Sequence, residues 1–103
     1  MKQTASTIVV GGGVIGLSLA WELAQRGRDV VVLEAKTVGQ GSSWAGAGVL
    51  PPTARHGTSD PYEQFRAMSH DLHPQWARRL HELSNIDTEF VRCGGIYLAS
   101  TPA

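Results

Sequence analysis

The pattern of apolar and polar positions over residues 6–34 predicts a strand, a helix and a second strand. A short β-branched run, Ser6–Val10, stops at three consecutive glycines. From Val14 to Gly27, apolar residues recur at positions 15, 19 and 23 beside small residues at 16, 20 and 24, which is typical of an amphipathic helix. The continuous apolar run Asp29–Glu34 is typical of a parallel strand buried on both faces. The three segments predict a right-handed βαβ unit.

The second half of the chain predicts a loop, a long helical segment and a return to strand. Turn-forming residues fill 51–60, and Pro74 inside the helical segment 61–85 is expected to kink or divide it. We interpret the apolar stripe of this helical segment as part of a packed core, or as a surface left exposed because the element that would cover it is missing. Residues 86–103 have strand character around two glycines. The stripe consists of Tyr62, Phe65, Met68, Leu72, Trp76, Leu80 and Leu83.

Composition narrows the class of protein. With 103 residues the chain is one domain at most, and a formal net charge of +0 gives no reason to expect nucleic acid or an anionic membrane as a partner. It contains no apolar run long enough for a bilayer and no signal peptide, so a cytoplasmic location is the default expectation. Cys93, the single cysteine, excludes an internal disulfide and a multi-thiolate metal site.

The strongest chemical signal is the glycine pattern between the first strand and the helix. Gly11, Gly13 and Gly16 give G-x-G-x-x-G at a strand-to-helix turn. The first glycine permits the tight turn, the second lets the backbone approach a pyrophosphate, and the third lets helix and strand pack closely. The helix N-terminus adds N–H groups and a partial positive charge. In a βαβ unit of this length, the pattern predicts dinucleotide binding rather than a purely structural turn.

Glu34 strengthens this interpretation. It follows Gly13 by 21 residues and ends the second strand, close to the spacing of about 20 expected for the acid that binds a ribose diol. Its charge argues against NADP, because a carboxylate would repel a 2′-phosphate. A solvated acid at the strand end is the alternative.

The segment GSSWAGAGVLPP, residues 41–52, separates two cofactor classes. An NAD-binding Rossmann domain continues from its acid into another helix, whereas this segment is too rich in small residues to supply one. It can instead lie flat against a planar ring and present N–H groups and hydroxyls to a flavin and a pyrophosphate. The alternative is a glycine-rich surface loop, against which Trp44 argues, because an exposed indole leaves a large apolar area in water.

These motifs together resemble the glycine oxidase and D-amino-acid oxidase family of FAD-dependent oxidases. The resemblance rests on GGGVIGLSLAWELAQRG, VVVLE and GSSWAGAGVLPP, and extends to PYEQFRAMSHDLHPQWARRLHEL and GGIYLA. It is closest to glycine oxidases associated with thiamine biosynthesis. It implies an α/β, Rossmann-like FAD-binding fold of the glutathione reductase type: a βαβ unit with a flavin-contacting segment over 1–50, a loop over 51–60, helix over 61–85, and the first strand of a substrate domain over 86–103.

Carried over by position, the resemblance implies a set of cofactor-binding residues. Val14 and Ile15 join the three motif glycines at the ADP pyrophosphate, and Glu34 holds the adenosine ribose. The resemblance also implies that Ala35 and Lys36 lie near the adenine and that Ser42 and Ser43 contact phosphate or ribityl oxygens. The residues that it places along the isoalloxazine are Ala45, Gly46, Ala47, Gly48 and Val49. The sequence departs from the family at Ala35, where a basic residue is frequent, and at Ala47, where glycine is frequent.

The resemblance also implies a reaction. Family members transfer a hydride from the amine-bearing carbon of an amino acid or amine to FAD, and O2 then takes the electrons to give H2O2. The side chains that hold the substrate carboxylate come from a later substrate domain, so we name no catalytic residue and expect the 103-residue chain alone to be inactive.

Several alternatives stay open. Other FAD enzymes of the sarcosine oxidase or glycerol-3-phosphate dehydrogenase type share the first motif, and an NAD-dependent Rossmann dehydrogenase is a further candidate. A non-catalytic fragment would self-associate through an unpaired strand edge, and a homo-oligomer is one of the assemblies considered. We expect no metal site from His56, His70, His73 and His81, and no nucleophilic role for Cys93.

Overall fold

The chain forms two compact units in the computed structural model, Met1–Val49 and Leu50–Ala103. The structure describes residues 4–53, 58–96, 98 and 100. Within these residues, no helix is long and apolar enough to cross a membrane.

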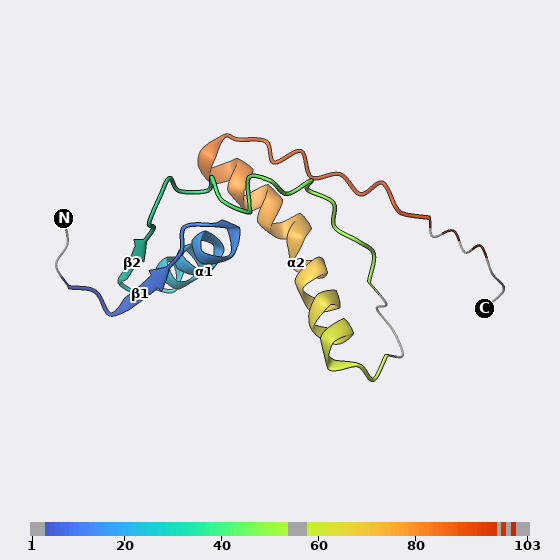
Figure 1. The fold of residues 1–103 in the computed structure, drawn as a ribbon, viewed down its shortest axis with the longest axis horizontal. Helices are drawn as coiled ribbons and strands as arrows, with labels where there is room; N and C mark the ends of the chain where they lie inside the picture. Colours follow the sequence, from blue (N-terminus) through green and yellow to red (C-terminus); the bar gives the residue numbers. More distant parts are fainter. Residues whose placement is uncertain (1–3, 54–57, 97, 99, 101–103) are drawn as a thin grey trace. The chain divides into compact units, whose positions relative to one another are not determined.

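The first unit is a βαβ unit, as the sequence predicts. It comprises β1 (Thr7–Val10), α1 (Val14–Gln25) and β2 (Val30–Leu33). The two strands are parallel, with Thr7 opposite Val30 and Val10 opposite Leu33, and α1 connects them (Figure 1). Valine and isoleucine dominate both strands, since branched side chains fit the pleated surface. The parallel pairing brings the ends of β1 and β2 to the same edge, where the glycine turn and Glu34 follow.

Helix α1 ends at Gln25, two residues before Gly27. Gly27 adopts a φ of +71°, a conformation that glycine takes without steric cost. Its N–H donates to the carbonyl oxygen of Ala24 at 2.9 Å, and the N–H of Arg28 donates to that of Leu23 at 3.0 Å. This pair of bonds is a Schellman motif, which satisfies carbonyls at the helix end and turns the chain back toward β2.

The face of α1 that packs on the strands is its small-residue side. Ala20 is buried, and a Cβ built at Gly16 would lie 3.3 Å from Cγ1 of Val9, the buried residue of β1. Ile15 and Leu19, which the periodicity places on the apolar face, are instead 82% and 51% exposed. Small side chains let the helix axis approach the strands, so the helix turns that stripe inward.

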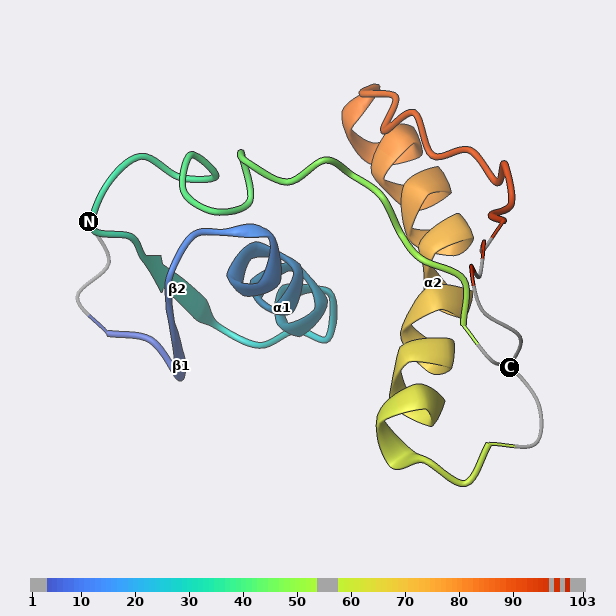
Figure 2. The ribbon, with the colours of Figure 1, turned by 45° about the vertical axis from the view of Figure 1, so that its right-hand side comes forward.

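The second unit is built on one helix, α2 (Pro61–Ser84), visible in Figure 2. Asp60 caps its N-terminus by accepting the N–H of Tyr62 at 2.9 Å, and the carboxyl end is capped by Asn85, with a φ of 56°. The helix runs through Pro74 without a break, so the expected division there is not found. None of its residues is buried, and its apolar stripe is exposed except at Trp76, which is half-buried.

The described residues after α2 contain no strand. Residues 86–96, 98 and 100 form no paired ladder with any other described segment, and a strand needs a hydrogen-bonded neighbour to form. The remaining positions of the predicted strand region lie outside the described residues. The assignment of 86–103 to a substrate domain stays a prediction.

Candidate functional site: a glycine turn held by Glu34 and Ser43

The glycine turn between β1 and α1 is shaped by backbone contacts that only glycine allows. Gly11 has a φ of 104°, which L side chains rarely adopt. A Cβ at Gly16 would overlap the carbonyl oxygen of Gly11, so the first turn of α1 sits directly against the turn. The first intrahelical bond joins the N–H of Leu17 to the carbonyl oxygen of Gly13 at 2.9 Å. The preceding N–H groups, from Val14 to Gly16, therefore have no acceptor inside the helix.

Glu34 reaches back from the end of β2 and binds the glycine turn. Its Oε2 accepts the N–H of Gly12 at 2.7 Å, and its Oε1 accepts the N–H of Lys36 at 2.9 Å. Hydrogen bonds from Gly12 and Lys36 favour the ionised form and lower the pKa of Glu34 below its ordinary value. Glu34 is thus an anchored carboxylate beside the helix N-terminus.

Ser43 binds the other side of the turn. Its Oγ accepts the N–H of Val14, the first residue of α1, at 2.8 Å. A Cβ at Gly13 would lie 3.0 Å from that same oxygen, so a side chain there would crowd the hydroxyl. The segment after Glu34 is tied down as well, because Gly39 donates its N–H to the carbonyl oxygen of Gly12 at 2.8 Å.

Gly12 is the site residue that sequence reasoning missed. It is buried, its N–H and carbonyl oxygen are both bonded, and a Cβ there would lie 3.2 Å from Cβ of Glu34. The G-x-G-x-x-G spacing treats this position as variable, so the motif gives no signal for it. The available clue was that Gly12, the second of three consecutive glycines, occupies a variable position of the motif, where a glycine indicates crowding.

The other predicted cofactor residues lie along a mostly exposed chain. Residues 42–45 form a turn in which Trp44 donates its N–H to the carbonyl oxygen of Gly41 at 3.1 Å. The indole of Trp44 is 76% exposed, so the cover expected for it is not found within the described residues. The structure therefore brings together the motif glycines, Glu34 and Ser43, but leaves exposed Ala35, Lys36, Ser42, Ala45, Gly46, Ala47, Gly48 and Val49.

The turn's donors and shape match what a dinucleotide needs. Helix N–H groups and a partial positive charge face the end of β1, which suits a pyrophosphate. Glu34 carries a charge and retains lone pairs for ribose hydroxyls, and the absence of side chains at Gly11 and Gly13 leaves room for close approach. No helix or strand occurs among the described residues between Leu33 and Pro61, as the flavin interpretation predicts and the nicotinamide one does not.

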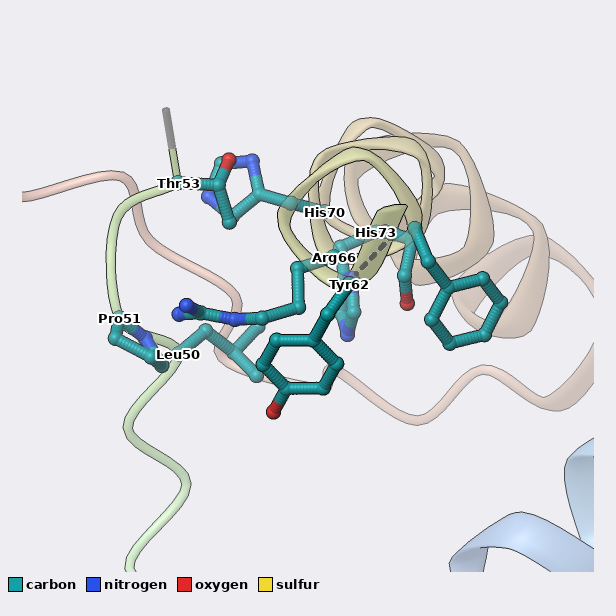
Figure 3. A pocket seen from close by; sticks show the side chains of 9 residues that line it. Leu50, Pro51, Thr53, Tyr62, Arg66, His70 and His73 are labelled. Carbon is teal, nitrogen blue, oxygen red and sulfur yellow. Dashed lines mark hydrogen bonds between the residues drawn. The ribbon is translucent and has the colours of Figure 1, made fainter. Parts of the chain in front are cut away.

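The second unit contains a pocket of about 240 Å³ between residues 50–53 and the first half of α2 (Figure 3). Tyr62 and Arg66 extend toward Leu50 and Pro51, and His70 lies beside Thr53 (Figure 3). The Arg66 guanidinium lies 5.8 Å from the Tyr62 ring centroid and pairs with Glu63 at 2.6 Å.

The histidines and the single cysteine were also considered as metal ligands. No cluster of three or more His, Cys, Asp or Glu side chains is placed there to hold an ion. His56 lies outside the described residues. His73 instead donates through Nδ1 to the carbonyl oxygen of Ser69 at 2.9 Å and stacks on Phe90, and Cys93 is exposed.

Comparison with known proteins gives one family. Residues 6–103 match DAO, described as FAD dependent oxidoreductase. The chain is 41% identical over 101 residues to a glycine oxidase of Geobacillus kaustophilus (98% of this chain, 27% of that one). It is 35% identical over 92 residues to the bifunctional protein ThiO/ThiG of Trichormus variabilis (89% of this chain, 14% of that one).

A solved structure agrees with the sequence match. The crystal structure of glycine oxidase from Geobacillus kaustophilus superposes with a TM-score of 0.72 and 38% identity, over 81% of this chain and 22% of that one. The α/β fold is thus that of the FAD-binding start of such proteins. The chain spans about a quarter or less of the length of the relatives it matches.

Proposed function

Because the chain belongs to the DAO family of FAD-dependent oxidoreductases, we propose that it is the N-terminal FAD-binding part of an oxidase acting on amino acids or other amines. The observation that carries the proposal is the glycine turn held by Glu34 and Ser43 at the start of α1. A turn that combines helix N–H donors with an anchored carboxylate has the chemistry of an ADP site.

Each half of the cofactor has its own residues in this proposal. Gly11, Gly13 and the first residues of α1, Val14, Ile15 and Gly16, line the pyrophosphate, and N–H groups at the helix start are its donors. The N–H groups of Gly11 and Val14 are not among these donors, because they donate to the carbonyl oxygen of Leu33 and to Oγ of Ser43. Glu34 accepts hydrogen bonds from the adenosine ribose, with Ala35 and Lys36 toward the adenine. Ser42 and Ser43 contact phosphate or ribityl oxygens. Ala45, Gly46, Ala47, Gly48 and Val49 would contact the isoalloxazine.

The cofactor carries the redox chemistry and the chain positions it. When bound, FAD would supply the acceptor for a hydride from the amine-bearing carbon and would let O2 take the electrons to give H2O2. The bonds from Gly12 and Lys36 hold the Glu34 carboxylate in place, where it would accept hydrogen bonds from the adenosine ribose. Glycine, sarcosine and D-amino acids are the proposed substrates, since the chain is similar to glycine oxidases.

The test compares the 103-residue chain with the protein expressed from its complete reading frame. We expect the latter to be yellow, with a flavin absorption spectrum, and to release H2O2 from glycine, sarcosine or a D-amino acid. The chain alone should bind FAD weakly and release no H2O2. Glycerol 3-phosphate and NAD serve as controls, because the two alternative enzyme classes would use them. Turnover of glycerol 3-phosphate, or tight NAD binding without flavin, would overturn the proposal.

A further inference from the structure

Ser42 and Ser43 are adjacent and chemically identical, yet the structure gives them different surroundings. The Oγ of Ser43 accepts the N–H of Val14 at 2.8 Å across 29 residues of sequence. Ser42 is exposed, and its side chain makes no hydrogen bond to any described residue. One serine is therefore tied to α1 and the other is not.

Helix α1 needs a cap from elsewhere because it has none of its own. Its N-cap residue is Gly13, which has no side chain, and its first turn holds no acidic residue. The usual cap is a Ser, Thr, Asp or Asn oxygen that accepts an N–H at the start of the helix. Ser43 supplies that oxygen from outside the helix, and Gly13 leaves the space for it.

Ser43 also holds the start of the segment that follows it, through its carbonyl oxygen. The carbonyl oxygen of Ser43 accepts the N–H of Gly46 at 3.4 Å, closing the turn at the head of residues 45–49. The hydroxyl uses a lone pair for Val14 and keeps its proton free to donate to another acceptor. Ser43 thus joins the phosphate end of the site to the segment proposed to contact the flavin.

We propose that Ser43 is a positioning residue, which caps α1 and holds residues 45–49 in place for the flavin half of FAD. The part of this inference that concerns the flavin rests on the proposed function. The cap itself does not need the cofactor. The proposal separates the two halves of FAD: losing the cap should loosen the hold on the flavin more than the hold on the ADP portion.

The cofactor-free test is amide hydrogen exchange at Val14 in the protein from its complete reading frame. In Ser43→Ala, exchange at Val14 should accelerate about fivefold or more, the size expected from losing one helix cap. Ser42→Ala should leave it unchanged, and Ser43→Thr, which keeps a hydroxyl, should retain most of the protection. Amides of β1 report whether the fold is intact. Equal exchange at Val14 in all four proteins would overturn the cap.

The second test compares affinities for FAD and ADP by flavin fluorescence and calorimetry. We expect Ser43→Ala to weaken FAD about fivefold while ADP changes by less than about twofold, and Ser42→Ala to weaken FAD less. Equal loss for FAD and ADP would overturn the positioning role in favour of a direct phosphate contact. If no protein binds FAD, the proposed function fails together with the flavin part, while the Val14 measurement still decides the cap.

Discussion

At the scale of single residues, Gly16 is the tightest point between α1 and the glycine turn. A Cβ there would overlap the carbonyl oxygen of Gly11 and lie 3.3 Å from Cγ1 of Val9. We expect Gly16→Ala to lower the free energy of unfolding by about 1–3 kcal/mol, because backbone must move to make room. Urea denaturation measures the change. Gly41→Ala is the matched control, since a Cβ there meets nothing within 4 Å; equal stability of both variants would contradict the prediction.

Glu34 gives a pH-dependent prediction whose sign follows from its bonds. Hydrogen bonds from Gly12 and Lys36 lower its folded-state pKa below the ordinary value of 4.5. A depressed pKa means that this carboxylate stabilises the fold above pH 4.5, and that the contribution is lost as pH falls through the folded value. Glu34→Gln should remove that part of the pH dependence.

Thermal unfolding of wild type and Glu34→Gln would measure this pH dependence of stability. The scans run from about pH 3 to pH 7, the range in which carboxylates titrate. The two proteins should differ most at neutral pH and converge in acid. Glu82→Gln, at an exposed glutamate of α2, is the control for a general loss of charge. A difference that grows toward acid would contradict the assignment.

Residue type explains which site residues the sequence reveals. Gly11, Gly16 and Glu34 are predictable because a positive φ, a missing Cβ and a charge each require a particular side chain. The partners of backbone groups leave no such mark. Neither Gly12 as the donor to Glu34 nor Ser43 as the cap of Val14 follows from the chain's spacing.

At the scale of elements, α2 depends on its ends, because none of its residues is buried. Asp60 accepts the N–H of Tyr62 at 2.9 Å. We expect Asp60→Ala to cost about 0.5–2 kcal/mol of helix stability, since one N–H at the start of the helix loses its acceptor. Circular dichroism through a thermal scan would show an earlier loss of helix signal. Ser59→Ala, one residue away and exposed, should leave the signal unchanged; an equal effect at both positions would contradict the capping role.

The elements that the sequence predicts well are those closed by local signals. Strand β1, helix α1 and strand β2 agree with the pattern, and Gly27 ends the helix. The inward face of α1 does not follow from hydrophobicity, because close approach to the strands favours Ala20 over Leu19. At Pro74 the local signal is misleading instead. Proline disfavours the interior of a helix, yet α2, a long helix with capped ends, continues through it.

At the scale of the whole molecule, the apolar pattern predicts a larger buried core than is found among the described residues. Val9 and Ala20 are their buried apolar residues, whereas Val10, Phe65 and Met68 are 83%, 69% and 69% exposed. A stripe of apolar residues indicates that a face can be buried, but which element covers it is a long-range property. Fold class and cofactor were therefore accessible from sequence, and the cover of the α2 stripe was not.

The contacts that shape the cofactor site also have an order along the chain. Glu34 meets Gly12 across 22 residues and Ser43 meets Val14 across 29, so the turn and both its anchors lie within residues 11–43. Chains emerge N-terminus first during synthesis. The glycine turn and both of its anchors can therefore close once residue 43 has left the ribosome, before any contact that depends on later residues.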